Sequence, residues 1–429
     1  MKKITILLLA IGSLLFVSPS FAAEVKSTVN AETTFVFNTL LFLVCGFLVM
    51  FMAPGFAMLE CGLVTSKSVS SIAAKNIALY SIAGIMFWLC GYNLAYGIPE
   101  GGFIGSFAPW VDATDFKTAK YAAGSDWYFQ MVFCATTASI VSGTLAERIK
   151  IWPFFLFTAI LCGILYPIEM GWQWGGGWLK VKGFSDFAGS TLVHAAGGAA
   201  ALAGAIVLGP RLGRFAKGVH LVPFAASSVP LATLGVFILW FGWFGFNGGS
   251  QLALGSYADA KAISTIFINT NLAACAGVMV NAAITRFVGG RTDVIMMLNG
   301  ALGGLVAITA EPLTPSPFAA ICIGGIGGAI VVIVTSILEK LKIDDVVGAI
   351  PVHLGAGIWG TIAVAITNKE TNFSTQLLGV LSVVGFMFIS SLIIWYIMKV
   401  TMGIRISDEA QKKGTDVSEI GVVAYAIRD

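Results

Sequence analysis

The stretch "DFAGSTLVHAAGGAAALAGAIVLG", residues 186–209, decides the fold class of this chain. After Asp186 it contains a single ionisable residue, His194, within a run of small and apolar residues long enough to cross the hydrocarbon core of a bilayer. A buried polar group without a hydrogen-bond partner costs roughly 2–7 kcal/mol. His194 therefore needs either a partner or a function.

Composition indicates a membrane protein. The 429 residues are 57% hydrophobic and only 11% charged, which is too little charge to cover the surface of a soluble protein of this length. We therefore expect most of the surface to contact membrane lipid. The net charge of +3 is small and its charges are dispersed, which excludes a nucleic-acid-binding protein.

Apolar segments of about 20 residues, the length needed to span a bilayer, recur along the whole chain. Eleven such segments are centred on residues 35–59, 77–97, 127–145, 151–172, 187–209, 221–246, 262–285, 294–310, 318–338, 346–367 and 376–399. The sequence therefore predicts an all-α polytopic membrane protein with eleven transmembrane helices.

The two ends of the chain differ from the apolar middle. Residues 1–22 begin with Lys2 and Lys3, continue with an apolar core and end in small residues, as is typical of a secretory signal peptide. We expect residues 23–402 to form the membrane domain and residues 403–429 a cytoplasmic tail.

The distribution of arginine predicts the orientation. All seven arginines lie in the odd-numbered loops or the tail, on one side of the predicted membrane. By the positive-inside rule this side is cytoplasmic. We expect a multi-pass protein of the cell (inner) membrane, with its N-terminus outside and its C-terminus in the cytoplasm.

A repeated motif gives His194 a counterpart. "VHAAGG" (193–198) in the fifth segment matches "VHLGAG" (352–357) in the tenth, and an aspartate, Asp186 or Asp345, stands eight residues before each histidine. Two copies of D-x7-H-x3-G, each ending a set of five spans, indicate an inverted five-plus-five repeat followed by a final helix. Inverted repeats are typical of transporters, with the substrate path between the halves. His194 and His353 should therefore approach each other in that path.

Two other interpretations of the histidines were considered. A single membrane histidine can simply pack against a neighbouring carbonyl, but two symmetry-related copies favour a function over packing. Two imidazoles without a third Cys, Asp or Glu at matching depth form a poor zinc site, so we predict no metal. The third histidine, His220, lies at the edge of a loop and is interpreted as ordinary.

Several longer motifs resemble a known family. These are "GTLAERI" (143–149), "WGGGWL" (174–179), "DFAGSTLVHAAGGAAAL" (186–202), "WFGWFGFNGGS" (240–250) and "DD…VHLGAGIWG" (344–360). Together they resemble the ammonium transporter (Amt/Mep/Rh) family over nearly the whole chain after the signal peptide, and Trp174 favours the Amt branch. The resemblance implies a homotrimer with one pore through each protomer and no cofactor.

The resemblance also assigns roles to single residues. It implies an outer recruitment site for ammonium formed by Phe133, Trp174 and Ser250. It implies a pore gate of Phe133 and Phe246, with Phe129 beside them and Trp243 lining the wall, followed by the pore histidines His194 and His353. Asp186 matches a buried acid that shapes the outer site without contacting the substrate, and Asp345 is its counterpart in the second repeat.

The implied chemistry has a physical reason. Ammonium has nearly the size and charge of potassium, but only ammonium can lose a proton. A dry, Phe-gated pore imposes a penalty of the order of tens of kcal/mol on a bare cation, whereas neutral ammonia escapes most of it. Two imidazoles in such a pore offer polar contacts and can relay a proton.

The chain departs from the family pattern on its cytoplasmic side. The departures are Glu60, Thr65 and Ser68 in the first loop region, Gly348 after the Asp pair, and Ile420 and Val422 in the tail. Family members are commonly regulated by a PII-type protein that docks here, and the departures leave that partner open. The positive-inside rule alone explains the six basic residues expected at its docking surface, Lys67, Arg148, Lys150, Arg211, Arg214 and Lys217. Glu147 and Arg148 are expected to form a structural pair.

Two rival functions were weighed against transport. One is an ammonium receptor that signals through a cytoplasmic partner, since the 27 residues after Met402 leave no room for a fused signalling domain. The other is an intramembrane enzyme, which the absence of a HExxH, a GxSxG or a nucleophile–base pair in any span argues against. We therefore expect no enzymatic activity.

Overall fold

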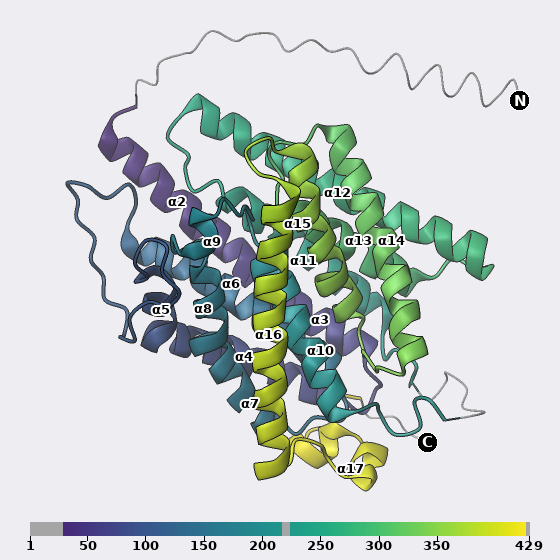
Figure 1. The fold of residues 1–429 in the computed structure, drawn as a ribbon. Helices are drawn as coiled ribbons and strands as arrows, with labels where there is room; N and C mark the ends of the chain where they lie inside the picture. The colour runs from purple at the N-terminus through teal and green to yellow at the C-terminus, as the bar shows by residue number, and fades with distance from the viewer. Residues whose placement is uncertain (1–28, 217–223, 426–429) are drawn as a thin grey trace, which may run out of the picture.

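The computed structural model describes residues 29–216 and 224–425, and within them it is a bundle of helices with one isolated bridge between Ile149 and Arg405. Figure 1 shows long helices lying side by side, with the C-terminal tail folded against one end of the bundle. The predicted signal peptide and His220 lie outside the described residues.

The helices follow the apolar segments of the sequence closely. In the first half they are α2 (Ala31–Met50), α3 (Met52–Leu63), α4 (Val69–Met86), η1 (Phe87–Gly91), α5 (Tyr92–Tyr96), α6 (Ala123–Thr144), α7 (Ile151–Ile160), η2 (Leu161–Leu165), α8 (Tyr166–Gly171), α9 (Trp178–Val181), η3 (Ser190–Ala195) and α10 (Ala196–Leu208). In the second half they are α11 (Val229–Gly249), α12 (Tyr257–Gly289), α13 (Val294–Thr309), α14 (Pro317–Leu341), η5 (Ile350–Gly355), α15 (Ala356–Thr367), α16 (Phe373–Thr401), α17 (Asp408–Lys413) and η6 (Asp416–Ile420).

The helices confirm an integral membrane architecture. Nine helical segments in the described part of the chain are long and apolar enough to cross a bilayer, and a shorter apolar helix, α13, accompanies them. The remaining predicted span corresponds to α6, which is buried along most of its length. Its hydroxyls bond to the backbone one turn earlier, as Thr136 does to Val132 and Ser139 to Ala135. A helix shielded by protein needs no lipid-facing surface, which explains why α6 is less hydrophobic than the other spans.

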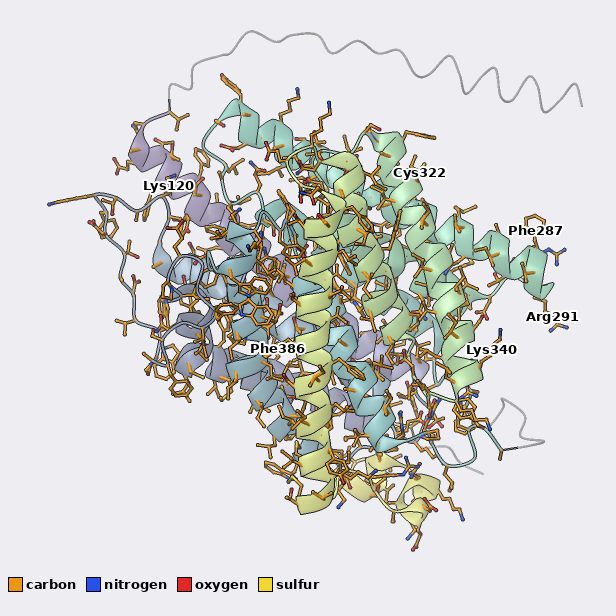
Figure 2. All side chains as sticks on the ribbon, viewed as in Figure 1. Lys120, Phe287, Arg291, Cys322, Lys340 and Phe386 are labelled. Carbon is orange, nitrogen blue, oxygen red and sulfur yellow. The ribbon has the colours of Figure 1, made fainter. Side chains whose placement is uncertain are left out.

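The lateral surface is apolar where the bundle is not covered by protein. Large hydrophobic side chains remain exposed there, such as Phe287 at 85% and Trp152 at 74%. Figure 2 shows Phe287 at the end of α12 and Cys322 on α14, both at the margin of the bundle. This surface suits a lipid environment.

The two copies of the motif cross inside the bundle, and the crossing explains why each copy contains a glycine. Gly198 and Gly357, the glycines of the two motifs, lie where the histidine-bearing segments meet. A Cβ on Gly198 would lie 2.6 Å from the backbone nitrogen of Leu354, and one on Gly357 would lie 2.4 Å from the carbonyl oxygen of Ser190. Each copy therefore needs glycine at this position so that the other copy can approach.

The tail packs against the loop between α3 and α4. The Asp416 carboxylate accepts hydrogen bonds from the backbone nitrogens of Val69 at 3.0 Å and Ser71 at 2.8 Å, which places it at the start of α4. Lys67 Nζ donates to the carbonyl of Lys412 at 2.9 Å. We call this end of the bundle the tail face and the opposite end, where α8 leads into α9, the aromatic face (Figure 1).

Candidate functional site

The two motif histidines meet inside the bundle. His194 Nδ1 and His353 Nδ1 lie 3.1 Å apart, and both side chains are buried. A hydrogen bond between two ring nitrogens needs one donor and one acceptor, so the pair shares a single hydrogen and the two rings adopt complementary tautomers. Each ring's Nε2 is then the nitrogen left for other contacts, and Nε2 of His194 has no hydrogen-bond partner among the described residues.

Capping aspartates position both histidines. The Asp186 carboxylate accepts four backbone N–H groups, from Gly189, Ser190, Thr191 and Leu192, at 2.8–2.9 Å. Asp345 accepts from the backbone of Gly348 at 3.2 Å and Ile350 at 2.7 Å, and from the Thr144 hydroxyl at 3.0 Å. Each histidine lies on the widened π-helical turn, η3 or η5, that follows its aspartate. Such turns often occur at functional sites because they reorient side chains that a regular helix would misplace.

Stacked phenylalanines lie between the histidine pair and the aromatic face. Phe133 of α6 and Phe246 of α11 are buried, with ring centroids 3.9 Å apart and planes 22° from parallel. Phe129 packs against Phe133 at 4.8 Å, and Phe246 packs against His194 at 5.4 Å. The two rings therefore separate the histidine pair from the aromatic face.

The outermost aromatic residue is Trp174. It is partly exposed, meets Phe133 edge-on at 6.0 Å, and donates from Nε1 to the carbonyl of Asp186 at 2.9 Å. Ser250, also partly exposed, donates to the Phe246 carbonyl at 2.9 Å, which leaves its oxygen lone pairs available as acceptors. The Asp186 loop and the Phe246 helix thus hold the two residues at the entrance to the stack.

Aromatic side chains pack against the two histidines from both sides. Trp243 stacks on His194 at 4.9 Å and 19°, and its Nε1 is satisfied by the Thr309 hydroxyl at 2.7 Å. Phe56 packs against His353 at 6.2 Å from the other side. Trp174, Phe133, Phe246, His194, His353 and Phe56 therefore form one continuous series of ring contacts through the bundle.

Below His353, toward the tail face, lies a narrow cavity of about 10 Å³, enough for one molecule the size of water or ammonia. Its lining includes His353, Asn299, Gly348 and Glu60. Glu60 departs from the family pattern, and the sequence predicts no role for it. The feature of the sequence that could have indicated a role for Glu60 is its carboxylate within the otherwise apolar "AMLECGL" (57–63).

Gly348 at this cavity has a local explanation. Its φ is +80°, a left-handed conformation that favours glycine, and a Cβ would lie 2.5 Å from the Asn299 amide nitrogen. The Asn299 amide in turn donates to the Val347 carbonyl at 3.2 Å. In this chain the position therefore calls for glycine.

A buried ionic cluster closes the tail face. Arg211 contacts Asp344 through two hydrogen bonds of 2.8 and 2.9 Å, and also contacts Glu147 at 3.2 Å. Arg148 is fully buried and donates to four backbone carbonyls, including that of Asp344 at 2.6 Å. The expected Glu147–Arg148 pair is therefore wrong. Glu147 instead joins Arg211 and the Thr65 backbone, because the Arg148 side chain turns toward the orphan carbonyls at the end of α6 and at Gly209.

Charge and burial shift the titration of this cluster. Burial opposes ionisation of Asp344, but hydrogen bonds from Arg211 and the charges of Arg148 and Arg211 outweigh it and hold the pKa of the carboxyl below its usual range. Burial lowers the pKa of the Arg148 guanidinium to about 10. Asp344 is therefore ionised and Arg148 protonated at neutral pH.

Comparison with known proteins adds an independent finding. A model of the Ammonium Transporter Family matches residues 40–425. The ammonium transporter Amt2 of Archaeoglobus fulgidus is 37% identical over 437 residues, covering 95% of this chain and 91% of that protein. The ammonium transporter Amt2 of Methanocaldococcus jannaschii is 36% identical, covering 94% of this chain and 95% of that protein.

Solved structures give the same result for the fold. A structure described as a sensor Amt protein superposes with a TM-score of 0.85 at 34% identity, covering 91% of this chain and all of that chain. The crystal structure of Mep2 from Candida albicans superposes with a TM-score of 0.80 at 26% identity, covering 92% of each chain.

Proposed function

The chain belongs to the ammonium transporter family, and from this premise we propose that it recruits ammonium at the aromatic face, removes a proton and conducts ammonia past the histidine pair. The observation that carries the proposal is the series of ring contacts from Trp174 to His353, with the 3.1 Å histidine pair behind a closed phenylalanine stack.

Recruitment would depend on Trp174, Phe133 and Ser250. A cation over an aromatic face gains roughly 0.5–2 kcal/mol, and a hydroxyl oxygen adds a hydrogen-bond acceptor. Trp174 is held in place by its bond to the Asp186 carbonyl, so the capping loop fixes both the entrance and the turn that carries His194.

Selectivity would follow from the closed stack. A potassium ion at Phe133 and Phe246 would have to shed its water and has no proton to lose that would make it neutral, at a cost of the order of tens of kcal/mol in a low-dielectric limit. Ammonium can give up its proton and continue as ammonia. The histidine pair then offers the neutral molecule a polar contact in an apolar channel.

Ammonium uptake by a cell that lacks its own uptake systems tests the proposal. Expression of this chain should restore growth on low ammonium. A receptor without transport would not restore growth, and that result would contradict the proposal. Immunodetection of the chain in the membrane fraction separates this result from failed expression.

The alternative is an ammonium receptor acting through a cytoplasmic partner. It is favoured by the likeness to the structure described as a sensor Amt protein, at a TM-score of 0.85. The uptake assay separates the two functions, because a receptor that does not conduct gives a signalling response without accumulation.

We further propose that residues 1–22 are a cleaved signal peptide, that residues 23–402 form the membrane domain of a homotrimer, and that residues 403–429 face the cytoplasm of a cell (inner) membrane protein. The arginine side chains gathered at the tail face support this orientation. Protease accessibility of the tail in sealed vesicles of known orientation tests it, and native mass spectrometry tests the trimer.

We also propose a PII-type protein as a partner at the tail face. Of the six basic residues expected at its docking surface, Arg211 and Arg214 pair with carboxylates and Arg148 is fully buried. Less positive charge is therefore available at the tail face than the sequence suggests. Pull-down of the cognate PII protein with the full chain, with and without ADP or 2-oxoglutarate, tests the proposal, and the absence of a complex in every condition would contradict it.

A further inference from the structure

Glu60 is a buried carboxylate that the proposed path does not yet use. It lies on α3, its side chain is 1% exposed, and it lines the same narrow cavity as His353, on the tail-face side of the histidine pair. The cavity holds about one small molecule at its volume of about 10 Å³. A molecule of ammonia that passes His353 would therefore meet this carboxyl group next.

The two carboxyl oxygens have different surroundings. Oε2 accepts from the Ser142 hydroxyl at 2.7 Å and from the Asn76 amide at 3.4 Å. Oε1 is buried and has no hydrogen-bond partner among the described residues. One oxygen is thus anchored to the protein, and the other has no partner among the described residues.

Lys75 provides a nearby positive group without occupying the free oxygen. Its Nζ is buried, donates to the Ser142 carbonyl at 2.7 Å and lies 4.9 Å above the Phe154 ring. Ser142 therefore bridges the two side chains, through its hydroxyl to Glu60 and through its carbonyl to Lys75.

A purely structural role explains only part of this arrangement. A carboxylate kept to join α3, α4 and α6 would be expected to use both oxygens, because an unpaired buried polar atom costs roughly 1–3 kcal/mol. The chain instead leaves Oε1 unpaired, on a residue that lines a cavity of molecular size. Such unpaired groups at a path are expected when a ligand completes them.

We propose that Glu60 is a proton-exchange site at the tail-face end of the pore, where it returns to ammonia the proton removed at the aromatic face. This inference rests on the proposed function. His194 takes the proton removed from ammonium and passes a proton on to His353 across the ring pair. Protonated His353 then gives its proton to the Glu60 carboxylate, which yields neutral imidazole and a carboxylic acid. The acid then gives the proton to ammonia, which yields ammonium and restores the carboxylate. Ammonia and one proton cross together, so one positive charge moves per ammonium.

The test measures charge and ammonium in the same proteoliposomes. Capacitive current on a supported membrane reports charge, and uptake of ¹⁵N-ammonium, corrected with protein-free vesicles, reports the molecule. Glu60→Gln preserves the shape and the bond from Ser142 but has no proton to exchange. We expect the ratio of charge to ammonium to fall at least tenfold.

Ser142→Ala is the matched control, since it removes a hydrogen bond to Glu60 and keeps the acid. We expect it to lower current and uptake together, with their ratio unchanged. Structural damage in E60Q would also lower both together, so an unchanged ratio in E60Q would overturn the proposal. If E60Q does not fold with Lys75 unpaired, the double variant E60Q/K75M removes both groups and is read in the same way.

Ammonium accumulation and net charge movement in the unsubstituted protein distinguish failure of the Glu60 proposal from failure of the proposed transport function. An unsubstituted protein that accumulates no ammonium contradicts the proposed function. An unsubstituted protein that accumulates ammonium without net charge contradicts only the role of Glu60.

Discussion

The two capping aspartates should differ in how much stability each contributes, and the difference can be worked out from their hydrogen bonds. In Asp186, Oδ1 accepts from the backbone of Gly189 and Ser190, and Oδ2 accepts from Thr191 and Leu192. Asn in its place keeps one oxygen, so whichever way the amide turns, two buried N–H groups lose their acceptor. At roughly 1–3 kcal/mol for each orphan group, Asp186→Asn should cost about 2–6 kcal/mol.

Asp345→Asn is the matched comparison at the symmetry-related position. Oδ2 of Asp345 accepts from Ile350, while Oδ1 accepts from Gly348 and from the Thr144 hydroxyl. A hydroxyl can rotate to accept from the new amide, so one backbone N–H is orphaned in either orientation. The expected cost is about 1–3 kcal/mol, half that of Asp186→Asn.

Thermal unfolding of both variants in the same detergent measures the comparison. We expect Asp186→Asn to lower the midpoint about twice as far as Asp345→Asn. It should also reduce ammonium uptake more, because its four N–H groups begin the turn that carries His194. An Asp186→Asn midpoint equal to or above that of Asp345→Asn would refute the reasoning from orphaned donors.

Three further predictions follow from single contacts. Trp174→Leu removes a cation–π face worth roughly 0.5–2 kcal/mol, so the half-saturating ammonium concentration should rise about 2- to 30-fold; an unchanged concentration dependence of uptake would exclude Trp174 from the site. Gly348→Ala should lower the unfolding midpoint more than Gly213→Ala, because both have φ near +80° but only Gly348 has Asn299 within 2.5 Å of a new Cβ; equal shifts would contradict the clash. Asp344→Asn should cost about 3–5 kcal/mol at pH 7, because it removes the buried carboxylate that accepts two side-chain hydrogen bonds from Arg211. Because the pKa of Asp344 is lowered in the folded state, its contribution to the free energy of unfolding is fully present above the unfolded pKa and is lost as pH falls through the folded pKa. The unfolding midpoints of the variant and the unsubstituted protein should therefore converge at acid pH. A difference that stays constant with pH would contradict the stabilising role of the ionised Asp344.

The sequence predicts the parts of this molecule that are periodic or repeated. Apolar segments gave the helices because a bilayer-spanning helix must be apolar over about 20 residues. The motif D-x7-H-x3-G predicted that His194 and His353 would meet, and their rings are in contact. The spacing did not predict why each motif ends in glycine, and the structure shows the reason, since Gly198 and Gly357 lie where the two copies cross.

Contacts between distant helices could not be read from the residues alone. The stack of Phe133 on Phe246 depends on how α6 and α11 face each other, and aromatic residues in spans are usually core or lipid-facing, so the family resemblance was needed to single them out. The direction in which Arg148 turns depends on which carbonyls remain free at helix ends, which only the fold shows. Glu60 is a carboxylate in an otherwise apolar stretch of sequence, but the unpaired oxygen on which its proposed role rests is a property of the packing.

We propose that conduction requires the histidine pair, because ammonium must give up its proton to pass the closed stack. Current measurements on reconstituted protein, with ammonium and with potassium, test it on His194→Ala, His353→Ala and the control His220→Ala. We expect each pore variant either to lose the ammonium current or to admit potassium, while the control keeps the rate and selectivity of the unsubstituted protein. Ammonium currents of normal size and selectivity in both pore variants would contradict the claim.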